Sequence, residues 1–203
     1  MMLYDTKVAP NPRRVRIFLA EKGIVVPTTN VDLGKLEHRD DAYSRINALQ
    51  RTPALVLDDG TVITESVAIC RYFDEIQPEP NIFGKGAIDK ALVEMWQRRL
   101  ELNLMLPTAQ VFRHSHPGMA QLEIPQIAQV AETSRPRVLD FLRVLDAHLG
   151  ARRFAAGDAF SIADITGLVG MDFLRLARIQ APPDLAHVAR WHAELSARPS
   201  AAA

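Results

Sequence analysis

The chain has 203 residues, of which 48% are hydrophobic, and this is enough to bury the core of one large domain or of two modest ones. Lysine plus arginine and aspartate plus glutamate balance at 24 each, which argues against nucleic acid or an anionic membrane as partner and favours a small ligand. The single cysteine, Cys70, excludes an internal disulfide and every multi-cysteine metal site. Because the sequence shows no apolar run of membrane-spanning length and no signal-peptide pattern, we expect a cytoplasmic protein.

The first part of the chain alternates between strand and helix patterns. A short strand over residues 2–4 precedes a helix over 12–22, in which apolar residues recur at helical spacing and which ends at Gly23. A second strand over 25–31 leads into a polar, poorly periodic stretch over 36–46. This opening predicts a β-α-β arrangement followed by a weakly marked second helix.

The sequence RTPALVLDDGTVITES, residues 51–66, predicts a hairpin. Residues 54–57 form a buried-strand run, an Asp-Gly pair marks the turn, and residues 61–63 form the second strand. A helix follows over 67–76, so the predicted order of this part is βαβαββα. A proline directly before a strand is commoner at an edge or in a special turn than in a sheet centre, which makes this position a functional candidate.

After the proline-rich segment 77–84 the chain shows only helix and loop patterns. A long amphipathic helix is predicted over 87–112. Another helical pattern covers 124–149, where Pro136 predicts a kink or a break and we expect two shorter helices.

A mostly apolar helix over 162–177 begins at Ser161, with an acid three residues later as in a capping box. Because this helix is apolar on several sides, it is predicted at the centre of a helical bundle. The chain therefore divides into an α/β domain over 1–77 and an all-helical domain over 85–203, joined by a linker over 78–84.

The start of the first helix is a candidate binding site. Asn11 is predicted as its N-cap and Pro12 as its first residue. The same N-terminus attracts anions through its free amides and its dipole, and Arg13 and Arg14 add positive potential. A thiol bound here would ionise below its usual pKa of about 8.5. That thiol would arrive with a ligand, because no cysteine is near in the sequence.

The start of the hairpin is a second candidate. A cis bond between Thr52 and Pro53 would turn the backbone amide and carbonyl of Thr52 outward to pair with an extended ligand, whereas a trans bond is the ordinary alternative. Glu65 and Ser66 begin the next helix and offer an acceptor for an ammonium group and donors for a carboxylate, unless Ser66 serves only as an N-cap. Together these groups suit an amino-acid head group.

Three short motifs are specific when taken with the element order. They are NALQRTPAL before the first hairpin strand, TES before an apolar helix, and FSIADI in the helical part. With the βαβαββα order, they resemble the cytosolic glutathione transferase family over nearly the whole chain. The resemblance implies a thioredoxin-like domain that binds glutathione as co-substrate, without a metal. It also implies a cis bond before Pro53, with glutathione extended along Thr52 and its γ-glutamyl end at Glu65 and Ser66.

The resemblance assigns further residues to glutathione. His38 matches a position that holds the glycyl carboxylate in theta-like members, and Arg51 matches a polar residue that helps it; a solvated loop histidine is the alternative for His38. Ala9 and Pro10 fall at the glutathione site, but Ala9 stands where serine-type members carry a catalytic hydroxyl. Asn11 matches an asparagine of Nu-class members. The resemblance therefore makes Asn11 the catalytic donor to the glutathione sulfur.

The end of the long helix is expected to face the second substrate. The resemblance places four residues there, Leu104, Gln110, Arg113 and His114. A metal site at His114 and His116 is disfavoured, because no third ligand is in sight. Cys70 lies on the apolar side of its helix and is predicted as a packing residue rather than a nucleophile.

The main functional hypothesis is a glutathione transferase whose thiolate attacks a small electrophile, a disulfide or a peroxide. One alternative is a non-catalytic binding module, because the usual catalytic hydroxyl is missing. Another is a glutathione-dependent isomerase or dehalogenase, which would share the same binding site. The resemblance also implies a homodimer, with no nucleic acid or membrane as partner.

Overall fold

The computed structural model describes all 203 residues, and the chain divides into two compact units. The first unit comprises residues 1–82 together with 199–203, and the second comprises 83–198. The sequence analysis assigned residues 199–203 to the helical domain, whereas in the structure they pack with the first unit.

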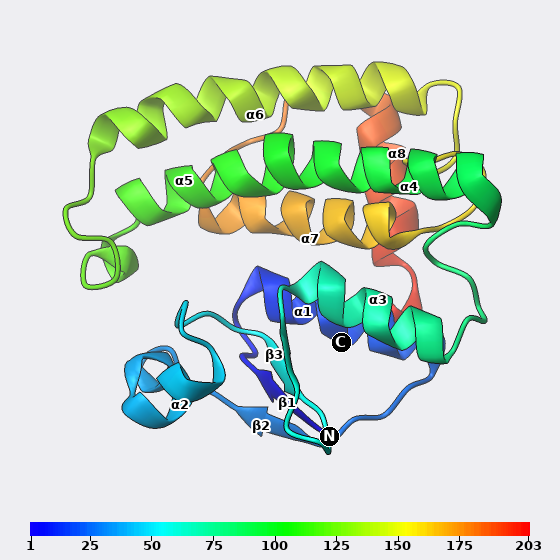
Figure 1. Ribbon diagram of the computed structural model, residues 1–203. Helices are drawn as coiled ribbons and strands as arrows, with labels where there is room; N and C mark the ends of the chain where they lie inside the picture. Colours follow the sequence, from blue (N-terminus) through cyan, green and yellow to red (C-terminus); the bar gives the residue numbers. More distant parts are fainter. The chain divides into compact units, whose positions relative to one another are not determined.

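The first unit is built on a four-stranded sheet with the order β2-β1-β3-β4 (Figure 1). The central strand β1 (Met2–Asp5) pairs in parallel with β2 (Thr28–Asn30) and antiparallel with β3 (Ala54–Val56). Strand β4 (Val62–Thr64) completes the hairpin with β3. Strand β2 is shorter than the predicted strand over 25–31, because only residues 28–30 of that segment pair with β1.

Three α-helices complete this unit: α1 (Pro10–Lys22), α2 (Asp41–Ile46) and α3 (Ser66–Ile76). Helices α1 and α3 lie side by side against the sheet, and α2 lies away from this pair (Figure 1). The apolar faces of α1 and α3 pack against the sheet and form a core with it. The fully buried side chains of this core include Leu3, Phe18, Leu55, Ile69 and Phe73. The predicted βαβαββα order is confirmed.

A buried ion pair joins the far ends of α1 and α3. The Lys22 ammonium lies 2.5 Å from Asp74 and also donates to the carbonyls of Gln77 and Pro78. The side-chain amide of Gln77 donates back to the Lys22 carbonyl at 2.6 Å. Because the Lys22 side chain is fully buried, all of its charge is balanced by these contacts rather than by water.

The end of the chain returns to α1. Residues Pro199–Ala202 form a short 3₁₀ turn, and the carbonyl of Ala201 accepts a 3.0 Å hydrogen bond from Arg13. The Ser200 hydroxyl donates to the Glu21 carboxylate. These contacts explain why the last five residues belong to the first unit.

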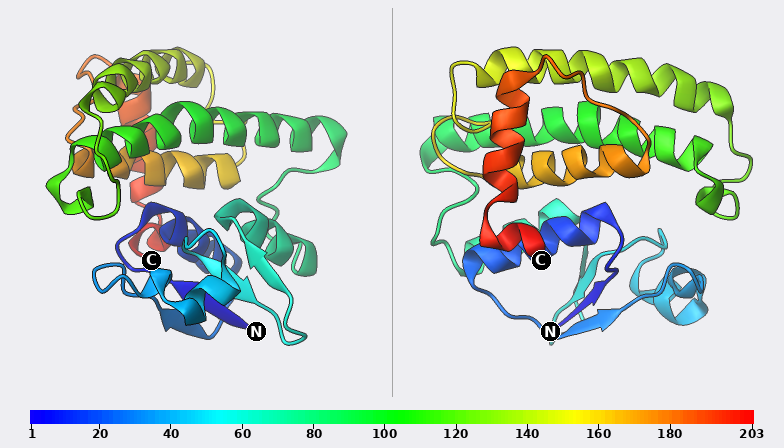
Figure 2. Two further views of the ribbon diagram at one scale, coloured as in Figure 1. Left: turned by 60° about the vertical axis from the view of Figure 1, so that its left-hand side comes forward. Right: turned by 180° about the vertical axis from the view of Figure 1, so that it is seen from behind.

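The second unit is entirely helical. It contains α4 (Gly86–Leu100), α5 (Leu106–Ser115), α6 (Ala128–Leu149), α7 (Ile162–Leu176) and α8 (Ala186–Ser196). Helix α8 packs against α6 and α7 and crosses them steeply (Figure 2). The predicted long helix over 87–112 is continuous in direction, but a π-helical turn, Glu101–Met105, separates α4 from α5.

The predicted division into two shorter helices was wrong, because Pro136 lies inside the single helix α6 and does not divide it. Proline removes one intrahelical hydrogen bond, at a cost of about 3 kcal/mol. The apolar face of α6 continues across this position, from Ala131 to Val138 and Leu142, all of which are buried. Burial of that continuous face offsets the lost bond, and Pro136 itself is exposed.

The capping box at the start of α7 is confirmed and does more than cap the helix. The Asp164 carboxylate accepts hydrogen bonds from the backbone amides of Ser161 and Ala155 and from the Trp191 indole of α8. Burial raises the pKa of Asp164, and these donors oppose the increase. Gly167 lets α8 approach, since a Cβ there would lie 2.1 Å from the Trp191 ring. One acid therefore joins α7, α8 and the preceding loop.

No helix is both long enough and apolar enough to cross a membrane.

Candidate functional site

Three segments of the first unit meet at one end of its sheet. The antiparallel pairing of β1 with β3 sets Tyr4 opposite Ala54, so the chain leaving β1 lies beside the chain entering β3. The pairing of β3 with β4 sets Ala54 opposite Thr64, so the chain leaving β4 lies at the same end. Of the predicted site residues, 9–11 come shortly after β1, 51–53 come directly before β3, and 65–66 come directly after β4.

Helix α1 begins two residues earlier than predicted. Pro10 is its first residue and Ala9, in an extended conformation, takes the N-cap position, so the prediction of Asn11 as N-cap was wrong. Prolines 10 and 12 have no backbone N–H, and both are tolerated in a first helical turn. Asn11 therefore carries the only free backbone amide among the first three residues of α1. Its side chain is exposed beside that amide.

A buried arginine fastens α1 to α3. Arg14 is only 1% exposed, and its Nη1 donates to the Ser66 hydroxyl at 2.7 Å and to the Asn11 Oδ1 at 3.4 Å. Because Oδ1 of Asn11 faces Arg14, its Nδ2 is left as the outward donor. The sequence analysis counted Arg14 only as positive potential. Its bridging role depends on the contact between helices that are 52 residues apart in sequence.

The start of α3 has an unusual backbone. Glu65 precedes the helix with φ 64° and ψ 116°, a conformation that residues other than glycine rarely adopt, and its side chain is exposed. Ser66 is the first residue of α3 rather than its N-cap, which is Glu65, and the Glu65 side chain makes no capping bond. The hydroxyl of Ser66 is instead turned toward Arg14.

The bond between Thr52 and Pro53 is cis, as the resemblance implies. Neither the N–H nor the C=O of Thr52 makes a hydrogen bond within the chain, and the residue is half-buried. The carbonyl of Arg51 is held at 2.6 Å by the Tyr43 hydroxyl and at 2.7 Å by the Asn47 side-chain amide. Burial raises the pKa of Tyr43 to about 12, which keeps its phenol protonated as a donor. These two residues of the α2 region, which the sequence analysis did not single out, fix the loop that presents Thr52.

Known proteins resemble this chain over most of its length. The family model for the glutathione S-transferase N-terminal domain matches residues 8–76, and the model for the C-terminal domain matches residues 104–199. Glutathione S-transferase 2 of Saccharomyces cerevisiae is 35% identical over 203 residues, which cover 98% of this chain and 87% of that protein. The chain belongs to the glutathione S-transferase family.

Solved structures of the glutathione S-transferase family show the same fold. A crystal structure of a glutathione S-transferase domain-containing protein from Marinobacter aquaeolei VT8 has a TM-score of 0.95 at 35% identity, covering 98% of this chain and 99% of that chain. Maleylacetoacetate isomerase of Pseudomonas aeruginosa is 36% identical over 93 residues, 45% of this chain and 44% of that protein. The fold class predicted from the sequence is confirmed, and the chain is an enzyme of this family.

The resemblance to glutathione S-transferases implies that His38 and Arg51 bind the glycyl carboxylate of glutathione. These two roles stay predictions. His38 is 7% exposed, so it is not the solvated loop histidine of the alternative interpretation, and its Nδ1 has no hydrogen-bond partner. Burial, followed by the nearby charges of Arg39 and Arg51, lowers its pKa. A neutral imidazole with one unsatisfied nitrogen beside an arginine is suited to a polar ligand group.

The residues predicted for the second-substrate pocket lie in the helical unit. Leu104 is fully buried and packs against Gly170 of α7. Arg113 donates to the Glu123 carboxylate at 2.5 Å, and the Nδ1 of His114 accepts from the backbone amide of Ile127. Gln110 is half-buried on α5 and makes no hydrogen bond through its side chain. Their role toward a second substrate stays a prediction.

Cys70 and possible metal ligands are further candidates for reactive sites in this glutathione S-transferase. Cys70 is fully buried, and burial raises the pKa of its thiol, so the prediction of a packing residue is confirmed. No group of three or more histidine, cysteine, aspartate or glutamate side chains lies together in a metal-binding arrangement.

Proposed function

We propose that the chain binds glutathione at the end of its sheet and stabilises the glutathione thiolate at Asn11. The observation that carries this proposal is the orientation of Asn11. Its Oδ1 accepts from the buried Arg14, which leaves its Nδ2 and its backbone N–H without a partner in the chain at the positive end of α1. Two donors at one helix start favour an anion over a neutral thiol.

The rest of the tripeptide has matching partners. The unused N–H and C=O of Thr52 pair with the extended backbone of glutathione in the manner of an added strand. Glu65 accepts from the γ-glutamyl ammonium, and Ser66 with its backbone amide donates to the γ-glutamyl carboxylate. His38 and Arg51 face the glycyl carboxylate, and the extended residue Ala9 and the first helical residue Pro10 form the wall beside the sulfur.

The reaction follows from the charge on the sulfur. The thiolate forms a C–S bond with an electrophilic carbon while the leaving group departs with the bonding electrons. With a disulfide, the thiolate instead attacks one sulfur and releases the other as a second thiolate. Each unit by which the site lowers the thiol pKa represents about 1.4 kcal/mol of preference for the thiolate.

The direct test is a pH titration of bound glutathione followed by thiolate absorbance, with turnover measured on a chlorinated aromatic and on a mixed disulfide. We expect the bound thiol to titrate below the free value of about 8.5 and at least one substrate to turn over. A thiol that binds without any change in pKa would contradict the proposed role of Asn11. The ratio of the two turnover rates separates conjugation from disulfide reduction.

A second candidate reaction is isomerisation with glutathione as true cofactor. The partial similarity to maleylacetoacetate isomerase favours it, although that similarity covers 45% of this chain. In such a reaction the thiolate adds to a conjugated double bond, the resulting single bond rotates, and the thiolate leaves unchanged. Glutathione that is required for turnover of maleylacetoacetate but is not consumed would identify this reaction.

We also propose that the protein is a cytoplasmic homodimer that detoxifies small electrophiles. The buried single cysteine suits a reducing compartment. Ile88 and Leu92 of α4, and Leu102 and Leu106 beyond it, are exposed apolar residues that a partner subunit would cover. The spacing of four residues within each pair places both members on one side of the helix.

A further inference from the structure

The loop between α2 and β3 is held by polar groups rather than by apolar packing. Ala48, Leu49 and Arg51 are exposed, and Gln50 has φ 53°, a value that residues other than glycine rarely adopt. Thr52, at the end of this loop, carries the N–H and the C=O that are proposed to pair with glutathione. The direction of these two groups therefore depends on the contacts that fix the peptide group before Thr52.

Two side chains donate to the carbonyl of Arg51. The Tyr43 hydroxyl of α2 lies 2.6 Å from this oxygen, and the Asn47 Nδ2 lies 2.7 Å from it. Asn47 also closes the turn, because its Oδ1 accepts a 3.0 Å hydrogen bond from the amide of Leu49. A carbonyl oxygen has two lone pairs, so these two donors satisfy the Arg51 carbonyl.

The Tyr43 hydroxyl is itself fixed by packing. Tyr43 is 5% exposed, and its ring lies edge-on to the ring of Tyr4 in β1, with 6.0 Å between the ring centroids and 68° between the ring planes. Burial raises the pKa of Tyr43 to about 12, so the phenol remains a hydrogen-bond donor at neutral pH. Tyr43 therefore connects the exposed loop to the central strand of the sheet.

The peptide bond between Arg51 and Thr52 transmits this restraint. It is trans, so the C=O of Arg51 and the N–H of Thr52 belong to one planar group and point in opposite directions. Donors that fix the carbonyl toward the end of α2 therefore fix the N–H away from it. Hydrogen bonds to the carbonyl also polarise the peptide group, which makes its N–H a stronger donor.

We propose that Tyr43 is a positioning residue for glutathione, whose hydroxyl orients the Arg51–Thr52 peptide so that the Thr52 N–H donates to the cysteinyl carbonyl of the ligand. This inference rests on the proposed glutathione site and adds the residue that sets the strength of one backbone contact. Asn47 shares this role, but it also shapes the turn. Because the contact is to the ligand backbone rather than to the sulfur, Tyr43 contributes to affinity and not to thiolate formation.

The test is the variant Tyr43→Phe, which removes the hydroxyl and keeps the ring against Tyr4. We expect the Kd and the KM for glutathione to rise about fivefold, because one hydrogen bond that orients the contact is lost. The kcat and the pKa of the bound thiol should equal those of the wild type. Calorimetry measures the Kd, and thiolate absorbance against pH measures the thiol pKa.

Two analogues of glutathione identify the affected contact. γ-Glutamylcysteine amide keeps the cysteinyl carbonyl and lacks the glycine, so Tyr43→Phe should weaken its binding by the same factor as for glutathione. γ-Glutamylcysteamine lacks that carbonyl, so it should bind the wild type and Tyr43→Phe equally. A tyrosine that only stabilises the loop would weaken both analogues alike when its hydroxyl is removed, and that result would overturn the proposal.

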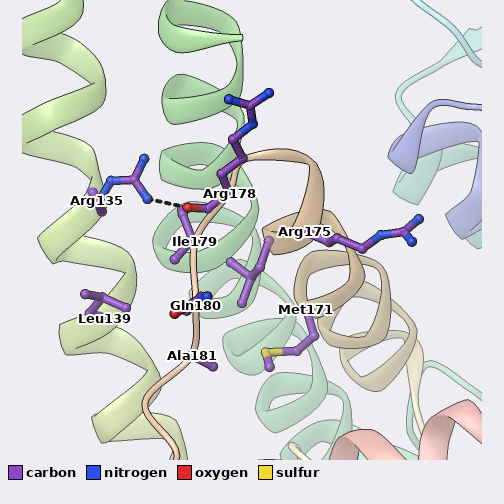
Figure 3. Close-up of a pocket in the computed structure, with 9 residues that line it drawn as sticks. Arg135, Leu139, Met171, Arg175, Arg178, Ile179, Gln180 and Ala181 are labelled. Carbon is purple, nitrogen blue, oxygen red and sulfur yellow. Dashed lines mark hydrogen bonds between the residues drawn. The ribbon is translucent and has the colours of Figure 1, made fainter.

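Two control variants test whether the effect is specific to Tyr43. Tyr72→Phe removes the hydroxyl of a half-buried tyrosine of α3 that makes no hydrogen bond to this loop. Arg135→Met removes the donor that lies 2.8 Å from the carbonyl of Arg178, in a loop beside a groove of the helical unit (Figure 3). Both variants should bind glutathione with the Kd of the wild type, and a fivefold loss in either would overturn the assignment to Tyr43.

The outcomes separate this inference from the proposed function. If the wild type binds glutathione with a lowered thiol pKa and Tyr43→Phe has the same Kd, only the role of Tyr43 is wrong. A change in the bound thiol pKa of Tyr43→Phe would also overturn that role, because the hydroxyl acts on a backbone contact. A wild-type protein that does not bind glutathione would overturn the proposed function and this inference together.

Discussion

Asn11 is the residue on which the proposed chemistry depends most. Removing its side chain in Asn11→Ala deletes one hydrogen bond to the thiolate, and such bonds to charged groups contribute about 1.5 kcal/mol or more. We expect the pKa of bound glutathione to rise by about one unit, with little change in glutathione affinity. The measurement is thiolate absorbance against pH, with affinity from calorimetry.

Ser66→Ala is the matched contrast to this variant. Ser66 is 5% exposed and is proposed to bind the γ-glutamyl carboxylate rather than the sulfur. Its loss should weaken glutathione binding about tenfold and leave the bound thiol pKa in place. If both variants changed affinity and pKa alike, the division between binding and thiolate stabilisation would be wrong.

The positions of the site residues could be predicted from the sequence, but their orientations could not. Thr52, Glu65 and Ser66 lie beside strand ends, and local patterns reveal strand ends. The bridge from Arg14 to Ser66 depends on the packing of α1 against α3, for which no local pattern exists. The helix start was predicted at Pro12, two residues later than in the structure. Pro10 is equally compatible with a first helical turn, so the proline preference alone could not distinguish the two positions.

At the scale of elements, periodicity predicted the helices whose faces are buried. The apolar helix after Ser161 was found with its capping box, because both its ends and its composition carry signals. Helix α8 was not predicted, although its buried residues Val188, Trp191 and Leu195 recur at helical spacing. The break at Pro136 was expected from local sterics alone, and tertiary packing of α6 overrides it.

His148 connects α6 with α4 and gives this unit a pH dependence. Its ring lies 3.8 Å from that of Trp96, and its Nε2 contacts the Ala155 carbonyl at 2.8 Å. Burial, together with the charges of Arg152 and Arg99, lowers its pKa below the ordinary 6.5. The unfolded chain therefore binds the proton more tightly than the folded chain does. The stabilising contribution is fully present above pH 6.5 and is lost as the pH falls through the lowered folded value.

We therefore expect the free energy of unfolding to decrease as the pH falls below the ordinary histidine pKa of 6.5 and through the lowered folded value. His148→Gln keeps a donor for Ala155 but removes the titration, so it should reduce this decrease. His187→Gln, at an exposed position, is the control. His38, whose pKa is also lowered by burial, contributes in the same direction and remains in both variants. An identical pH slope for His148→Gln and the wild type, measured by urea unfolding, would contradict the assignment.

At the scale of the whole molecule, the resemblance predicted more than the residue patterns did. Strand order and the cis bond before Pro53 follow from family membership, because no local signal distinguishes a cis from a trans proline. The return of residues 199–203 to α1 was not predicted, since an alanine-rich tail has no apolar periodicity. A single sequence carries the least information about contacts between distant parts of the chain.

The exposed apolar residues of α4 allow a test of the proposed homodimer. Ile88 is 79% exposed and Leu92 is 40% exposed, although each would gain about 1.5 kcal/mol or more from full burial. A symmetric dimer would pair this surface with its own copy, so charges introduced there would repel across the axis. The double variant Ile88→Glu with Leu92→Glu should therefore sediment as a monomer with unchanged helix content. Val144→Glu, on the exposed side of α6, should remain dimeric like the wild type. A wild-type protein that sediments as a monomer at micromolar concentration would show that this surface has no partner subunit.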